Sequence, residues 1–193
     1  MQRSKAALFT AALLPLAALV FMALTQKLGA NPVETIIRDL GEWGLRFLLL
    51  TLAVTPVRLL TGWHVLARYR RMLGLFAFIY VMLHMLTFLA VDLQFDMAAL
   101  WREIIKRKFI TVGMLALLLL IPLAVTSTDS MIKRLGGARW KALHKLIYPA
   151  AMLACLHFYW MVKADKTEPL VYAAALAAML LYRLFRRQRA RPA

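Results

Sequence analysis

A chain of 193 residues with 63% hydrophobic residues and a mean hydropathy of +0.69 is too apolar for a soluble domain of this size. A net charge of +16 can indicate nucleic-acid binding, but here the basic residues lie beside long apolar runs, so we expect no nucleic-acid partner. The chain is therefore interpreted as an integral membrane protein that contacts lipid, because a helix must stay apolar for about 20 residues to cross a bilayer.

Six apolar stretches are long enough to be read as transmembrane helices. They cover residues 6–24, 43–60, 72–91, 109–126, 144–162 and 169–185 approximately. The first follows a basic N-terminus, as in a signal peptide, but it is longer than a signal core and no clear cleavage site follows it. We expect it to be retained. The stretches predict an all-α fold, a bundle of six transmembrane helices that forms a single domain over residues 1–193.

The second stretch is the least regular of the six. Arg46 lies near one end and Pro56 near the other. Proline is tolerated in membrane helices when neighbours satisfy the freed carbonyl, and an arginine near a helix end can extend its charge to the interface. We therefore keep this helix and expect Arg46 to reach towards headgroups.

Charge is distributed unequally between the two sides of this bundle. The side that holds the N-terminus, the loops 58–71 and 128–145 and the C-terminal tail carries 16 of the 25 Lys and Arg residues and one acid, Asp129. Basic segments stay in the cytoplasm. Both termini are therefore predicted to be cytoplasmic.

The loop 92–108 lies on the opposite side and shows helical periodicity. Its apolar residues oppose its charged ones: Phe95, Leu100, Trp101, Ile104 and Ile105 against Arg102, Glu103, Lys106 and Arg107. This pattern is typical of an amphipathic helix in the membrane interface. A simple anchor is the favoured interpretation, and a docking surface for a periplasmic partner is the alternative.

Two histidines lie inside predicted helices, where an ionisable side chain is costly and usually functional. His84 follows Arg71 by 13 residues and His157 follows His144 by 13 residues, which places both histidines ~20 Å from the cytoplasmic edge. Two imidazoles at one height on helices 3 and 5 suit the axial positions of haem iron. Zinc usually needs four ligands, and no acid lies within a predicted helix core. Histidines hydrogen-bonded across helices remain the alternative.

His144 lies near the cytoplasmic edge and is a candidate ligand of a second haem. At this height, helix 3 offers Arg70 and Arg71, which are suited to haem propionates or a flavin phosphate rather than to iron. On an ideal helix His144 and His157 point about 140° apart, so either they face different neighbours or Pro149 changes the register. His64, in the basic loop, is expected to be solvated.

Several segments together resemble a known family. They are Arg70-Arg71-Met72-Leu73-Gly74-Leu75, Leu83-His84, Thr126-Ser127-Thr128-Asp129, Leu135-Gly136, Trp140-Lys141-Ala142-Leu143-His144-Lys145-Leu146-Ile147-Tyr148, and His157. Over essentially its whole length the chain resembles the MsrQ family (also called YedZ) of the ferric-reductase-like transmembrane superfamily. Any one of these histidines alone would be a weak signal, whereas the Trp-x-x-Leu-His-x-Leu-x-Tyr segment with a histidine 13 residues later is specific.

The resemblance implies a b-type haem protein of the bacterial inner membrane, with one or two haems on His84, His144 and His157. It implies electron transfer without catalytic residues of its own, from the quinone pool or a separate cytosolic flavin reductase. The acceptor is MsrP, a periplasmic molybdopterin enzyme that reduces methionine sulfoxide in proteins, and FMN is a further cofactor of the family. Two other functions stay open: a stand-alone ferric or cupric reductase, and a transporter or membrane anchor without haem.

Overall fold

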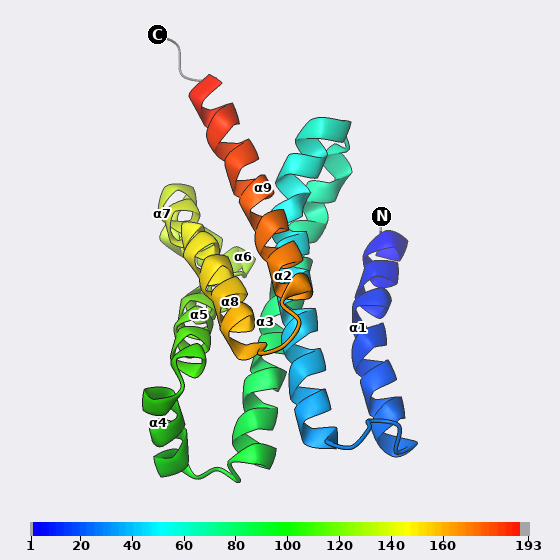
Figure 1. Ribbon diagram of the computed structural model, residues 1–193. Helices are drawn as coiled ribbons and strands as arrows, with labels where there is room; N and C mark the ends of the chain where they lie inside the picture. The colour runs from blue at the N-terminus through cyan, green and yellow to red at the C-terminus, as the bar shows by residue number, and fades with distance from the viewer. Residues whose placement is uncertain (1, 190–193) are drawn as a thin grey trace.

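The computed structural model describes residues 2–189, and every regular element within them is helical. In chain order these are α1 (Gln2–Leu24), α2 (Pro32–Thr61), η1 (His64–Tyr69), α3 (Arg70–Thr87), η2 (Phe88–Asp92), α4 (Met97–Lys106), α5 (Lys108–Val125), α6 (Asp129–Leu135), α7 (Gly137–Leu143), η3 (His144–Leu146), α8 (Ile147–Met161) and α9 (Thr167–Arg189). The first turns of α1 and the last turns of α9 lie at the same end of the bundle (Figure 1).

Within the described residues, five helical stretches are long and apolar enough to cross a membrane. They are Arg3–Leu24, Pro32–Thr61, His64–Asp92, Lys108–Val125 and Thr167–Arg189. The remaining predicted stretch, 144–162, consists of the 3₁₀ turn η3 and the 15-residue helix α8. Pro149 has no N–H to donate to Lys145, so an α-helix cannot run regularly through this point. The fold is thus an all-helical membrane domain with five clear candidate spans and one shorter apolar helix.

The helix α2 is longer than the predicted stretch 43–60. It begins at Pro32, directly after Asn31, whose side chain accepts a hydrogen bond from the Glu34 backbone N–H. Asparagine before proline is a favourable helix start. The helix ends at Gly62, which adopts a left-handed φ of 74° and donates its N–H to the Arg58 carbonyl. The residues that precede the predicted stretch thus add polar turns at the N-terminal end of α2.

Because α2 begins early, Arg46 has polar partners that the sequence did not predict. Arg46 lies well inside the helix, and its guanidinium pairs with Glu42 at 2.9 Å and with Glu168 of α9 at 3.2 Å. It also donates to the Tyr172 hydroxyl at 2.7 Å. Arg46 therefore has acidic partners on α2 and α9, and one of them, Glu42, lies inside a helix long enough to cross a membrane. This polar network joins α2 to α9.

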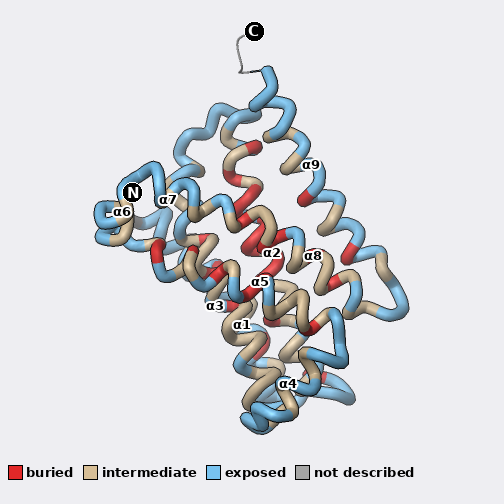
Figure 2. The backbone as a smooth tube through the Cα atoms, turned by 90° about the vertical axis from the view of Figure 1, so that its left-hand side faces the viewer, coloured by how far each residue is buried: buried red, intermediate tan, exposed pale blue. Residues whose placement is uncertain are grey.

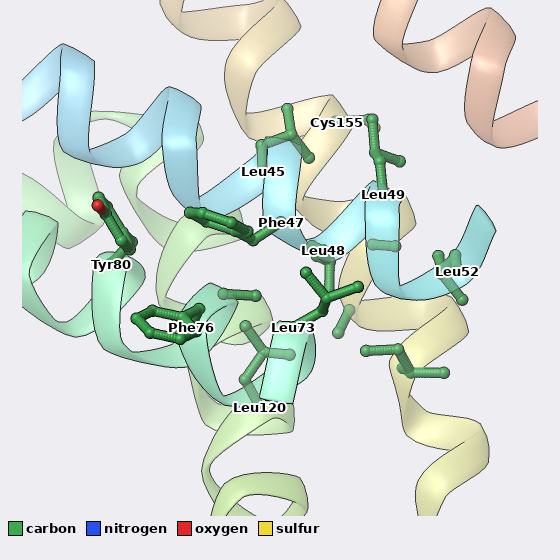
Figure 3. Packing of buried hydrophobic residues seen from close by; sticks show 14 of the residues in the cluster. Leu45, Phe47, Leu48, Leu49, Leu52, Leu73, Phe76, Tyr80, Leu120 and Cys155 are labelled. Atoms are coloured by element: carbon green, nitrogen blue, oxygen red, sulfur yellow. The ribbon is translucent and has the colours of Figure 1, made fainter. Parts of the chain in front are cut away.

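The apolar core is centred on α2, where buried residues are concentrated (Figure 2). In Figure 3, Leu48 of α2 lies beside Leu73 of α3 and Phe47 of α2 beside Phe76 of α3, with Leu120 of α5 close to them. Cys155 of α8 is a free, buried member of the same cluster. The helices α2 and α3 form one closely packed pair and α5 and α8 form another. His84 of α3 and His157 of α8 come from different pairs.

Tyr80 connects α1 to α3 through its hydroxyl group. The hydroxyl donates to the Ala12 carbonyl at 2.8 Å and accepts from the Leu16 N–H at 3.1 Å. These two backbone groups belong to one turn of α1, the turn that contains Pro15. Tyr80 thus supplies polar partners at a point where a proline disturbs the helix ladder.

We expect Tyr80→Phe to lower the free energy of unfolding by about 1 kcal/mol, because a donor and an acceptor in an apolar interior lose their partner. The unfolding midpoint of the detergent-solubilised protein measures this effect. Tyr182→Phe is the matched control, because within residues 2–189 the Tyr182 hydroxyl makes no hydrogen bond. Equal midpoints for the two variants would contradict the assigned role.

The predicted amphipathic helix in the 92–108 loop is α4. Asp96 caps it by accepting from the Ala99 N–H at 2.9 Å. Met97, Trp101 and Ile105, each four residues apart, are 53%, 64% and 66% exposed, so they form one apolar stripe on the outer face. Phe95 lies before the helix, with a φ of 59°. An exposed apolar stripe of this kind suits insertion into the membrane interface.

Candidate functional site

His84 of α3 and His157 of α8 lie opposite each other. Their ring centroids are 6.1 Å apart, and the ring planes are inclined by 81°. The sequence placed both residues at one height from their distances to the cytoplasmic edge. The structure brings them together in one site between the α2–α3 pair and the α5–α8 pair.

Each of these imidazoles is held by a backbone carbonyl of a neighbouring helix. The Nδ1 atom of His84 is 2.8 Å from the Ile37 oxygen of α2, and that of His157 is 2.7 Å from the Phe109 oxygen of α5. A carbonyl only accepts, so both Nδ1 atoms carry the proton. Each neutral ring therefore keeps its Nε2 lone pair free, which is the arrangement found in metal-ligating histidines.

Two glycines make room for the imidazole rings. A Cβ on Gly41 of α2 would lie 2.9 Å from His84 Nδ1, and a Cβ on Gly113 of α5 would lie 2.7 Å from His157 Nδ1. Gly41 follows Ile37 by one helical turn, and Gly113 follows Phe109 in the same way. The same notch, a carbonyl with a glycine one turn later, thus occurs twice, once for each histidine.

Sequence reasoning missed both glycines. They resembled ordinary interruptions of apolar helices, and glycine in membrane helices is frequent enough to carry little information alone. The sequence did offer one signal: each of the two apolar helices that face a buried histidine carries one of these glycines, at the depth of that histidine. Recognising it required knowledge of which helices are neighbours.

The two histidines line a cavity of about 450 Å³, a size typical of cofactor sites. Leu48, Leu117 and Phe158 belong to its mostly apolar wall. Charged residues of α2, of the end of η2 and of the position before α5 also line it, namely Glu34, Arg38, Glu42, Asp92 and Arg107. A flat apolar group with acidic substituents at one edge fits such a space.

These residues fit haem better than a bare metal ion. Haem iron accepts two axial imidazoles, and the macrocycle needs an apolar cavity around them. Within residues 2–189, no three His, Cys, Asp or Glu side chains gather to hold a metal ion on their own. The two free Nε2 atoms and the two glycine notches are the observations on which this fit rests.

His144 lies elsewhere, in the turn η3, and does not line this cavity. Its ring stacks on Trp140, with centroids 3.8 Å apart and an interplanar angle of 27°. Its Nδ1 is 3.1 Å from the Trp140 carbonyl, and its Nε2 is 3.5 Å from the Ser127 hydroxyl. The 3₁₀ turn lets His144 and His157 face different neighbours, which was one of the two alternatives left open by the sequence.

The two arginines predicted near His144 have different surroundings. Arg71 forms an ion pair with Asp129 at 2.7 Å, so its guanidinium already has an acidic partner. Arg70 interacts electrostatically with His144 and with two further arginines, Arg58 and Arg183. The fourth histidine, His64, is exposed in η1, as expected.

Comparison with known proteins identifies the family. Residues 40–155 match the family model described as ferric reductase like transmembrane component. A protein of Rhodospirillum rubrum named protein-methionine-sulfoxide reductase heme-binding subunit MsrQ is 57% identical over 178 residues, which are 92% of this chain and 86% of the relative. Proteins of the same name from Herminiimonas arsenicoxydans and Caulobacter vibrioides are 52% and 49% identical, over 94% and 91% of this chain and 84% and 83% of their own lengths.

No solved structure matches the chain significantly. The family assignment therefore rests on sequence similarity, which extends over nearly the whole chain and includes the segments that carry His84, His144 and His157. The chain belongs to the MsrQ family of methionine sulfoxide reductase heme-binding subunits, within the ferric-reductase-like transmembrane proteins.

Proposed function

We propose that this protein carries electrons across the bacterial inner membrane through a b-type haem held between His84 and His157. The observation that carries the proposal is the pair of facing imidazoles, each with its Nδ1 fixed by a carbonyl and its Nε2 free. When bound, the haem supplies a one-electron redox couple whose potential depends on axial ligation and burial.

The residues of the chain have separate roles in this proposal. His84 and His157 would hold the haem iron, and the Ile37 and Phe109 carbonyls orient their rings. Apolar residues such as Leu48 and Phe158 exclude water from the cavity. Arg38 lines the same cavity where it becomes charged, and its guanidinium suits a haem propionate, whereas Arg107 in the same lining already pairs with Glu103 at 2.6 Å.

The proposed topology has six crossings within one domain of residues 1–193. The sixth is α8, extended towards the cytoplasm by η3 and α7. Support comes from the start of α1 and the end of α9 at one end of the bundle (Figure 1) and from the excess of Lys and Arg there. Both termini are then cytoplasmic, and the His84–His157 site lies in the periplasmic half of the bilayer.

The electron donor in this proposal is the quinone pool or a cytosolic flavin reductase, and the acceptor is a periplasmic subunit, MsrP, that reduces methionine sulfoxide. The relatives' name, a heme-binding subunit of a methionine sulfoxide reductase, supports a separate catalytic partner. The description of the family model favours a second candidate, a ferric reductase that passes electrons to metal chelates. Reduced protein mixed with MsrP or with a ferric chelate separates the two, because only the physiological acceptor reoxidises the haem rapidly.

A second haem on His144 and a bound FMN stay predictions. The pyridine haemochromogen assay gives the number of haems per chain, and a flavin assay on the denatured protein gives the FMN content. We expect one haem to disappear in His144→Ala if the wild-type protein carries two. A wild-type count of one that is unchanged in this variant would remove His144 from the set of haem ligands.

The test of the main proposal is the absorbance spectrum of the detergent-solubilised protein. We expect a Soret band that shifts on reduction, as in six-coordinate b-type haem. A protein that folds with all its helices but shows no Soret band after haem is supplied would contradict the proposal and would favour a transporter or anchor.

A further inference from the structure

Three arginines from three helices converge at the end of the bundle opposite the haem cavity. Arg58 belongs to the last turn of α2, Arg70 to the first turn of α3 and Arg183 to α9. Arg70 interacts electrostatically with both others, and Arg183 donates to the Tyr148 hydroxyl at 3.0 Å. Only the tertiary fold brings these side chains together, since more than a hundred residues separate Arg58 from Arg183.

This arginine cluster (Arg58, Arg70 and Arg183) has no anion among the described residues. No carboxylate within residues 2–189 lies at ion-pair distance from any of its three guanidinium groups, and the nearby Asp129 is already paired with Arg71. The Nε atoms of Arg58 and Arg183 are buried without a hydrogen-bond partner. Converging like charges with unpartnered donors are costly, so the site is built for an anion.

The position of the cluster indicates where the anion comes from. Arg58 and Arg183 lie near the ends of two apolar spans, and Arg183 also donates to the Leu52 carbonyl inside one of them. Basic pockets between membrane helices at this level bind acidic lipid headgroups. Guanidinium groups suit phosphate because they offer paired, planar donors.

We propose that the arginine cluster binds the phosphate of an anionic phospholipid, held between α2, α3 and α9. The site rests on the membrane placement under the proposed function but does not involve the haem cavity. The phosphate accepts hydrogen bonds from the guanidinium groups, offsets part of their mutual repulsion, and fastens α9, whose outer surface is mostly exposed, to the rest of the bundle (Figure 2).

Binding of phosphatidylglycerol to the delipidated, haem-loaded protein tests this site. Native mass spectrometry measures the affinity, with phosphatidylcholine as the neutral probe. We expect tight, selective binding of phosphatidylglycerol to the wild type, weakened about fivefold for each guanidinium removed, so that Arg58→Gln with Arg70→Gln loses about 25-fold. The matched control is Arg186→Gln with Arg187→Gln, which removes the same charge from the exposed end of α9.

Equal lipid affinities in the cluster variant and in the control variant would overturn the proposal. So would a loss of haem or flavin from the cluster variant with unchanged lipid binding, since the arginines would then hold a cofactor. If the glutamine variant does not fold, Arg58→Lys with Arg70→Lys keeps the charge but removes the paired donors, and selective binding must still fall. Haem content is measured on every sample, so failure of the haem proposal is seen separately.

Discussion

Replacing His84 or His157 with alanine is expected to abolish the Soret band of the six-coordinate haem. In the proposed site each imidazole would hold the haem iron from one side, and the imidazole across the cavity could not replace it there. In membranes, the affected helices should still form, because each substitution removes an ionisable group from an apolar region. We therefore expect loss of haem with an unchanged helical signal in circular dichroism.

His64→Ala is the control for these two variants. His64 is exposed in η1 and lies outside the haem cavity, so the variant should bind haem like the wild type. A Soret band of wild-type position and intensity in both His84→Ala and His157→Ala would show that the facing imidazoles do not ligate the haem.

The sequence predicted the helices well wherever hydropathy alone decides them. The predicted stretch 109–126 corresponds to α5, and the stretch 72–91 corresponds to α3 with its terminal π turn η2. The start of α2 was missed because its first turns, from Pro32 to Glu42, are polar on one side and lack the apolar signal. Asn31 and Pro32 did offer a helix start, which a search for capping residues would have found.

The relation between His84 and His157 was also predictable, because depth in a membrane helix follows directly from residue number. Their partners were not. The Ile37 and Phe109 carbonyls, Gly41 and Gly113 lie on helices that hydropathy does not arrange in space. Helix neighbours are set by packing, and in lipid packing depends on small residues whose effect is visible only after the helices are assembled.

The arginine cluster likewise could not be predicted from the sequence alone. In the sequence, Arg58 and Arg183 are two of many basic residues that the positive-inside rule explains sufficiently. Their buried, unpartnered Nε atoms distinguish them from residues that only set topology. That distinction depends on burial, which a single sequence does not give for a helix end.

Gly113→Ala and Gly41→Ala are expected to weaken haem binding about 10- to 100-fold, as loss of an outer partner of a metal ligand does. The added methyl group would lie 2.7 Å or 2.9 Å from the Nδ1 of the facing histidine, closer than two such atoms can approach. The imidazole must then move and lose its hydrogen bond to the Phe109 or Ile37 carbonyl. The haem dissociation rate, the midpoint potential and the Soret position all report this displacement.

Gly74→Ala separates the effect of the notch from the general effect of adding a methyl group. Its Cβ would lie 3.6 Å from the Thr51 methyl carbon, an ordinary contact. Alanine is also favoured over glycine within a helix by about 1 kcal/mol, so this control variant should be at least as stable as the wild type and bind haem equally. The same substitution thus has opposite consequences in α3 and in the two notches. If Gly41→Ala and Gly113→Ala bind haem as tightly as Gly74→Ala does, the notches do not position the ligands, and the Nδ1–carbonyl bonds are not what fixes the imidazoles.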